Sequence, residues 1–202
     1  MSLNFSKWID RYEAANPDES IEYRDSSGTW KEDKDYRFSS ISSELQQRGY
    51  IYRDELRKIG GWKVPTGRID HLLKQNNPNH VEQQSAVAFQ TNSDEEKVEA
   101  LMELKGVRVP VASSILTMAE PANYAVVDYR AFRALGAANP QLLDSQTYPQ
   151  YVEFIEHFRN YNSATEAYSF YMDAIRDVAQ RERILPREVD MALWAFDEAN
   201  SS

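Results

Sequence analysis

Cysteine is absent from the 202 residues of this chain. Without thiols the chain has no disulfide framework, no cysteine nucleophile, and no iron–sulfur cluster or zinc site built on thiolates. Histidine is also scarce, and the spacing of His71, His80 and His157 does not match a metal-binding motif. We therefore expect the protein to work without a metal or any other cofactor.

Long hydrophobic runs are missing too, since no window approaches about 18 consecutive apolar residues. The first residues lack the basic and then apolar pattern of a secretory signal. From these two features we expect a cytoplasmic protein with no membrane segment.

Basic residues are outnumbered, with 23 Lys and Arg against 32 Asp and Glu and a formal net charge of −9. A surface with this charge is not uniformly attractive to nucleic acid. A local basic patch stays open as an alternative, because lysines and arginines cluster at residues 53–74 and 105–108. An ordinary solvated acidic surface and a salt-adapted source would each explain the excess of acid.

Helical signals dominate the chain, and strand signals are few. Apolar spacing and helix-boundary residues predict helices at 5–14, 36–48, 53–59, 67–74, 81–89, 93–104, 109–118, 128–135, 149–160, 163–183 and 186–198. Gly60-Gly61 is expected to end the third helix, and residues 24–34 are expected to form a loop or short turn. About ten helices with short connections predict an all-α globule.

The length suits a single domain over residues 1–202, which we expect to be built from two lobes. One lobe covers about residues 40–140 and contains the most informative part of the chain. The second lobe is formed by residues 1–39 together with residues 141–202.

The turn Lys105-Gly106-Val107-Arg108 joins the predicted helices 93–104 and 109–118. A short turn between two helices leaves backbone N–H groups without helical partners at the start of the second helix. Such groups bind anions, typically a phosphate. The turn therefore indicates an anion-binding helical hairpin.

A single acid, Asp128, follows an apolar run that extends from Tyr124 to Val127. A lone carboxylate delivered in this way suits a one-acid reaction on a substrate that is held by its phosphate. The same residue would also serve as the N-cap of the helix predicted at 128–135. Both interpretations stay open from the pattern alone.

The segment Leu104-Lys105-Gly106-Val107-Arg108 resembles the helix-hairpin-helix of the DNA glycosylase superfamily, which includes endonuclease III and the adenine and 8-oxoguanine glycosylases. That family usually has Leu-Pro-Gly-Val-Gly, a helix, a proline-containing loop, then Val-Asp and an arginine further on. Here Val127-Asp128 matches the Val-Asp pair, and Arg133 matches the arginine. The resemblance covers about residues 101–135 and continues more weakly over 40–100.

The resemblance implies that Asp128 is the catalytic acid and that double-stranded DNA is the partner of a monomeric protein. A carboxylate stabilises the positive charge that develops on deoxyribose when the base–sugar bond breaks, and it orients or deprotonates the attacking water. The resemblance further implies a DNA-backbone contact by Lys105, Gly106, Val107 and Arg108, and a structural or phosphate-binding role for Arg133.

Two positions depart from the family pattern. Pro110 stands where bifunctional members carry the lysine that forms a Schiff base with the sugar, and no other lysine follows before residue 135. The chain is therefore expected to be monofunctional and to use water. Arg108 replaces the second hairpin glycine, which lets the backbone approach a phosphate closely. The Arg108 side chain would either grip the phosphate itself or lie solvated on the surface.

Residues 60–68, Gly-Gly-Trp-Lys-Val-Pro-Thr-Gly-Arg, form a second region of interest. This composition suits a loop that approaches a nucleic acid, with Lys63 and Arg68 on phosphates. It equally suits a tryptophan packed into the core with its neighbours turning the chain. The candidates for a pocket that receives an extruded base are Trp62, Trp30 and Tyr129.

Three functions remain open at this point. The first is a DNA-repair enzyme, a monofunctional DNA glycosylase that hydrolyses the N-glycosidic bond of a damaged or mispaired base with Asp128. The second is a non-catalytic helix-hairpin-helix module that binds DNA or a protein, and the third is a protein-interaction scaffold in which the turn only connects helices. The surroundings of Asp128 discriminate among them, because only the first requires an accessible acid.

Overall fold

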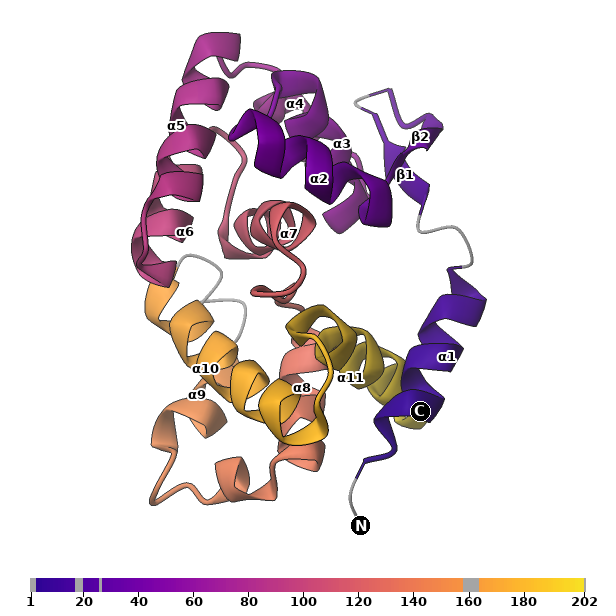
Figure 1. The fold of residues 1–202 in the computed structure, drawn as a ribbon, viewed down its shortest axis with the longest axis vertical. Helices are drawn as coiled ribbons and strands as arrows, with labels where there is room; N and C mark the ends of the chain where they lie inside the picture. Colours follow the sequence, from indigo (N-terminus) through magenta and orange to yellow (C-terminus); the bar gives the residue numbers. More distant parts are fainter. Residues whose placement is uncertain (1–2, 17–19, 26, 158–163, 202) are drawn as a thin grey trace. The chain divides into compact units, whose positions relative to one another are not determined.

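The computed structural model describes residues 3–16, 20–25, 27–157 and 164–201 (Figure 1). Over these ranges the chain forms eleven α-helices, one short 3-10 helix and a two-stranded sheet. The prediction of an all-α fold with about ten helices is confirmed. The chain divides into two compact units: a central unit, Asp18–Glu120, and a terminal unit, Met1–Pro17 with Pro121–Ser202.

The central unit is built around α7 (Val109–Ala119), of which ten of the eleven residues are buried. Helices α2 (Phe38–Arg48), α3 (Arg53–Lys63) and α6 (Asp94–Met102) pack against it (Figure 1). The Ser42 hydroxyl and the Gln46 amide, both on α2, donate to the Ala119 carbonyl at 3.0 and 2.8 Å and so satisfy the last turn of α7. The remaining helices of the unit are α4 (Asp70–Leu73) and α5 (Pro78–Gln90).

The expectation of a loop or short turn at residues 24–34 is wrong at residues 24 and 30–34, which lie in the strands of a β-hairpin. Strand β1 (Ser20–Arg24) pairs antiparallel with β2 (Trp30–Arg37), and α2 begins directly afterwards at Phe38. The sequence of β2, Trp-Lys-Glu-Asp-Lys-Asp-Tyr-Arg, lacks the alternation of apolar and polar residues that reveals a strand. Its pairing with β1 could therefore not be predicted from the pattern.

The expected helix end at Gly60-Gly61 is also wrong, since α3 continues through both glycines to Lys63. A Cβ atom at Gly60 would lie 2.5 Å from the Leu73 Cδ1 atom, and one at Gly61 would lie 2.7 Å from the Tyr23 Cβ atom. These glycines allow α4 and β1 to approach the helix backbone, so their role is packing and not helix termination.

The terminal unit is organised around α11 (Pro186–Asn200), which packs against α1 (Phe5–Ala15), α8 (Tyr129–Ala138) and α10 (Thr165–Glu182). The ring of Trp8 on α1 packs edge-to-face on Phe196 with centroids 5.4 Å apart. A short 3-10 helix, Pro140–Leu143, and α9 (Pro149–His157) lie next to α8 along the chain. The helices predicted at 149–160 and 163–183 each extend onto residues outside the described ranges.

The boundaries of the two units differ from those predicted for the lobes, about 40–140 and 1–39 with 141–202. Residues 20–37 belong to the central unit because β1 packs against α3. Residues 121–140 belong to the terminal unit because α8 packs against α11. The turn at 105–108 and Asp128 therefore lie in different units.

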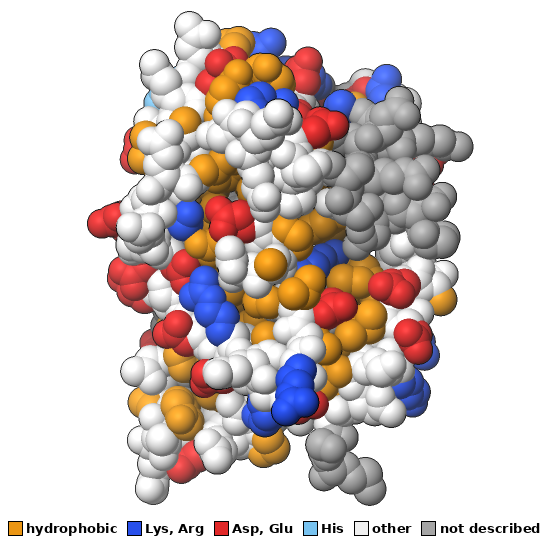
Figure 2. All heavy atoms as spheres, viewed as in Figure 1, with side chains coloured by type: hydrophobic (Ala, Val, Ile, Leu, Met, Phe, Trp, Pro, Cys, Tyr) orange, Lys and Arg blue, Asp and Glu red, His pale blue; other side chains and the backbone are white. Residues whose placement is uncertain are grey.

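The surface carries charges of both signs. Figure 2 shows Lys and Arg side chains interspersed with Asp and Glu side chains over the face in view. None of the described helices is long and apolar enough to cross a membrane. Among the described residues no three or more His, Asp or Glu side chains are placed to hold a metal ion.

Candidate functional site

The connection between α6 and α7 is a tight helical hairpin. The Leu104 N–H donates to the Leu101 carbonyl and the Val107 N–H donates to the Leu104 carbonyl, both at 3.1 Å. Gly106 lies between them with φ of +84°, in the left-handed region that favours glycine. Helix α7 then begins at Val109, so the predicted hairpin geometry is present in the central unit.

The hairpin presents several groups suited to an anion. The N–H groups of Gly106, Arg108 and Val109 donate to no acceptor within the described ranges. They lie at the start of α7, where the helix dipole favours negative charge. The side chains of Lys105 and Arg108 are exposed, and Arg108 Nη1 donates to the Val107 carbonyl at 3.2 Å.

Val107 does not fit the DNA contact expected of it. Its side chain is fully buried, and its N–H is already bonded to Leu104. The valine instead anchors the turn in the core of the central unit. The hairpin groups that are suited to an anion are therefore Lys105, Gly106 and Arg108, together with the Val109 N–H.

Asn76 holds the hairpin in place. Its buried side chain, 4% exposed, accepts a hydrogen bond from the Lys105 N–H at 2.8 Å and donates to the carbonyls of Lys105 and Leu73, both at 2.9 Å. On the same side, a Cβ atom added at Gly106 would lie 3.0 Å from the Leu72 Cβ atom and 3.1 Å from Leu73 Cδ2. The turn therefore packs against α4 and is hydrogen-bonded to Asn76, which follows α4 in the chain.

The 60–68 region divides between core and surface. Trp62 is half-buried, and its ring centroid lies 5.4 Å from that of Phe38 with the planes tilted by 59°. Lys63, the last residue of α3, is half-buried, whereas Arg68 is exposed. Trp30, at the start of β2, is 55% exposed. Trp62 therefore packs against the buried Phe38 while part of its side chain stays accessible.

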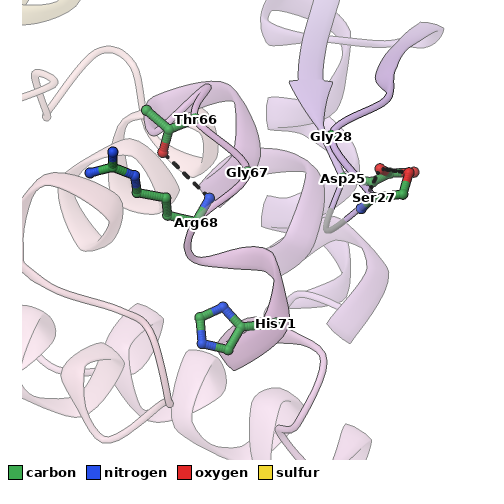
Figure 3. Close-up of a pocket in the computed structure, with 7 residues that line it drawn as sticks. All are labelled: Asp25, Ser27, Gly28, Thr66, Gly67, Arg68 and His71. Atoms are coloured by element: carbon green, nitrogen blue, oxygen red, sulfur yellow. Dashed lines mark hydrogen bonds between the residues drawn. The ribbon is translucent and has the colours of Figure 1, made fainter.

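Arg68 lines an open pocket of about 660 Å³ in the central unit (Figure 3). The other lining residues are Asp25, Ser27, Gly28, Thr66, Gly67 and His71. Figure 3 shows Arg68 on the α3–α4 connection, His71 on α4 and Asp25 on the β1–β2 turn across from them. The Ser27 hydroxyl, which donates to the Asp25 carboxylate, lowers the pKa of Asp25, so one wall of the pocket is anionic. This mixture of charges does not define an anion site.

Asp128 caps α8 in the terminal unit. Its backbone is extended, with φ −141° and ψ 149°, and its Oδ1 atom accepts a hydrogen bond from the Arg130 N–H at 2.9 Å. The side chain is half-buried. The capping role considered from the sequence is therefore present, and it engages one of the two carboxylate oxygens in a backbone hydrogen bond.

The segment before Asp128 is held by side chains. The Val126 N–H donates to Asp190 Oδ2 at 2.7 Å, and the Val126 carbonyl accepts a hydrogen bond from the Tyr171 hydroxyl at 3.1 Å. The Tyr168 hydroxyl donates to the Ala125 carbonyl at 3.4 Å. All three side chains are buried, and they come from α10 and α11.

Arg187 completes this buried group, which we call the segment cradle: Tyr168, Tyr171, Arg187 and Asp190. Arg187, 6% exposed, forms an ion pair with Asp190, and its Nη2 atom donates to the Tyr12 hydroxyl at 2.9 Å. Burial raises the pKa of Tyr171 well above its ordinary value, and the carboxylates of Asp190 and Asp128 raise it further. The Tyr171 hydroxyl therefore remains a hydrogen-bond donor.

Arg133 has a structural partner. It forms a bidentate ion pair with the buried Asp197, with both N–O distances at 2.7 Å, and this pair raises the pKa of the guanidinium. The guanidinium lies 5.2 Å from the ring centroid of Tyr129, which is 40% exposed. Of the two roles implied for Arg133, the geometry supports the structural one, which ties α8 to α11.

Sequence reasoning missed Asn76 and the segment cradle. Tyr168 and Tyr171 lie in the helix predicted at 163–183, but nothing local indicated that their hydroxyls would bond a segment more than forty residues earlier. Arg187 and Asp190 did give a signal. They are opposite charges three residues apart on one helix, a spacing at which side chains meet.

Comparison of the chain with protein-family models, curated proteins and solved structures finds no match. The resemblance to the helix-hairpin-helix glycosylases over about residues 101–135 stays a prediction from the hairpin, Val127-Asp128 and Arg133. Any function must therefore be argued from these residues and from the geometry within each unit.

Proposed function

We propose that this protein is a monofunctional DNA glycosylase, a DNA-repair enzyme that hydrolyses the N-glycosidic bond of a damaged or mispaired base. The hairpin carries the proposal. Its left-handed Gly106, its three N–H groups without an acceptor in the described structure, and its two exposed cations are arranged as an anion site.

In this proposal the hairpin binds a phosphate of the DNA backbone. The N–H groups of Gly106, Arg108 and Val109 donate to its oxygens, and the side chains of Lys105 and Arg108 supply positive charge. Such contacts position the duplex without reading its sequence. The net charge of −9 limits any wider attraction, so few phosphates should be contacted and the affinity should fall only modestly with salt.

Asp128 is the proposed catalytic group. The N-glycosidic bond breaks with its electron pair leaving on the base, and the Asp128 carboxylate stabilises the positive charge that develops on the sugar. Water then forms the new bond to C1′, and its proton passes to the carboxylate. The position at the N-terminus of α8 favours the ionised form that both steps require.

Pro110 supports the monofunctional assignment. It replaces the lysine that would attack the sugar, and its ring nitrogen is part of the main chain and cannot form an imine. Borohydride added during the reaction should therefore trap no covalent protein–DNA adduct. An adduct that survives denaturation would contradict the assignment.

The alternative is a non-catalytic helix-hairpin-helix module that binds DNA or a protein. The hydrogen bond from the Arg130 N–H to Asp128 favours it, because an acid that caps a helix has a structural role without any chemistry. The two proposals share the hairpin and differ only in what Asp128 does.

The test uses duplexes that carry oxidised, alkylated, deaminated or mispaired bases, followed by alkali to cleave any abasic site. The proposal predicts cleavage of at least one duplex by the wild-type chain and none by Asp128→Asn. The matched control is Asp177→Asn, which neutralises an exposed aspartate on α10 and should cleave like wild type. Binding without cleavage would favour the module, and equal activity of Asp128→Asn would refute the proposed mechanism.

A further inference from the structure

We propose that Tyr171 and Asp190 are positioning residues that set the location of the Asp128 carboxylate. The inference deepens the proposed function and rests on it for its catalytic consequence. Neither residue belongs to the stretch that carries the family likeness, and they lie 45 and 64 positions from the residue they bond. The connection exists only in the folded terminal unit.

The two side chains grip a single residue from both sides. Asp190 accepts the Val126 N–H at 2.7 Å, and Tyr171 donates to the Val126 carbonyl at 3.1 Å. Because both backbone polar groups of Val126 are bonded, neither of its flanking peptide planes can rotate without breaking a hydrogen bond. Val127, 3% exposed, is the only residue between this grip and Asp128.

Residues 124–127 need this support because they belong to neither helix nor sheet. The sheet of the described structure is confined to the central unit, so no strand satisfies their backbone groups. A buried N–H or carbonyl without a partner costs about 1–3 kcal/mol. The segment cradle takes the place of a neighbouring strand.

The grip is stiffened by charge. Asp190 is ionised opposite Arg187, so its bond to the Val126 N–H is charge-assisted and stronger than a neutral one. Arg187 is held in turn by the Tyr12 hydroxyl at 2.9 Å. Burying an ion pair has a large desolvation cost, and apolar residues often replace such a pair without loss of stability. What an apolar pair cannot supply is an acceptor for Val126.

The activity test pairs Tyr171→Phe with Tyr151→Phe. Tyr151 is also a fully buried tyrosine of the terminal unit, and its hydroxyl bonds Gly136 and Phe132, outside the 124–128 segment. Each variant removes one buried hydroxyl. Because a misplacement of about 1 Å can cost roughly 10²-fold in rate, single-turnover excision should slow at least tenfold in Tyr171→Phe, with DNA affinity unchanged. Tyr151→Phe should excise at the wild-type rate, and an equal slowing of both variants would overturn the inference.

A second measurement needs neither DNA nor activity. Amide hydrogen exchange reports the Val126 N–H and the Arg130 N–H, which the Asp128 carboxylate accepts. The double variant Arg187→Met with Asp190→Leu removes the ion pair without leaving a buried charge. Both amides should then lose at least tenfold in protection, while amides in the middle of α11 keep theirs.

The outcomes separate the inference from the proposed function. If the wild-type chain excises no base, the glycosylase proposal fails, and the exchange measurement still decides whether the cradle positions Asp128. Unchanged protection of Arg130 in the double variant and in Tyr171→Phe would overturn the positioning role even in an active enzyme. Loss at Arg130 in these two variants and not in Tyr151→Phe would support it.

Discussion

Replacing Gly106 by alanine perturbs the hairpin in two ways. The residue has φ of +84°, and an L-residue with a Cβ pays about 1–2 kcal/mol in the left-handed region. The new Cβ would also lie 3.0 Å from Leu72 Cβ and 3.1 Å from Leu73 Cδ2, closer than ordinary van der Waals contact. Overpacking of this kind adds about 1–3 kcal/mol. The total expected destabilisation is therefore about 2–5 kcal/mol.

Gly49 offers a matched control in the same unit. Its φ is +78°, and a Cβ added there would meet nothing within 4 Å. Gly49→Ala should therefore cost only the backbone term, about 1–2 kcal/mol. The difference between the two variants isolates the contact between the hairpin and α4.

Urea unfolding of both variants measures this difference as a shift in midpoint at constant slope. Fluorescence anisotropy with a labelled duplex at low salt then reports the effect on DNA binding. Gly106→Ala should bind at least tenfold more weakly, because the turn must move away from α4, while Gly49→Ala should bind like wild type. Equal stability losses in the two variants, or unchanged DNA affinity in Gly106→Ala, would refute the reasoning.

Three further substitutions test the packing and the pH response. Asn76→Ala removes two hydrogen bonds to Lys105 of the hairpin and one to the Leu73 carbonyl, and it should lower the unfolding free energy by about 2–4 kcal/mol in urea titrations. Ser85→Ala leaves the buried Ile51 N–H, now 3.0 Å from the Ser85 hydroxyl, without its acceptor and should cost about 1–3 kcal/mol in the same assay. Burial raises the pKa of Tyr151 from 10.0 to about 12, so its contribution is complete below pH 10 and is lost as pH rises through about 12. Wild type should therefore lose about 2–3 kcal/mol more than Tyr151→Phe between pH 9 and pH 12, and parallel pH curves would contradict this.

The parts of the fold that could be predicted from sequence are those with a local signal. Ser93 accepts a hydrogen bond from the Glu96 N–H at 3.3 Å, as expected of the residue that starts α6. Strand β2 could not be predicted because its sequence lacks the alternation of apolar and polar residues that is typical of a strand. The helix end predicted at Gly60-Gly61 was wrong because the sequence does not distinguish a glycine that ends a helix from one that lets a neighbouring element pack closely.

In the candidate site, too, only the features with a local sequence signal could be predicted. The hairpin turn and the cap at Asp128 are formed by neighbours in sequence, and their geometry was predicted. The hydrogen bonds from Asn76 to the hairpin and from the segment cradle to Val126 join residues 29 to 64 positions apart. No short sequence pattern predicts such pairings. Val107 was assigned to DNA from the motif alone, and its burial follows from packing that the motif does not describe.

One measurement directly addresses the proposed role of Asp128 in breaking a base–sugar bond. Chromatography monitors the single-turnover release of the free base from a duplex that the wild-type chain cleaves. The DNA affinity of each protein is measured in parallel. The proposed mechanism predicts that Asp128→Asn slows release by roughly 10²–10⁴-fold and binds the duplex as tightly as wild type. Release at the wild-type rate by Asp128→Asn would contradict it.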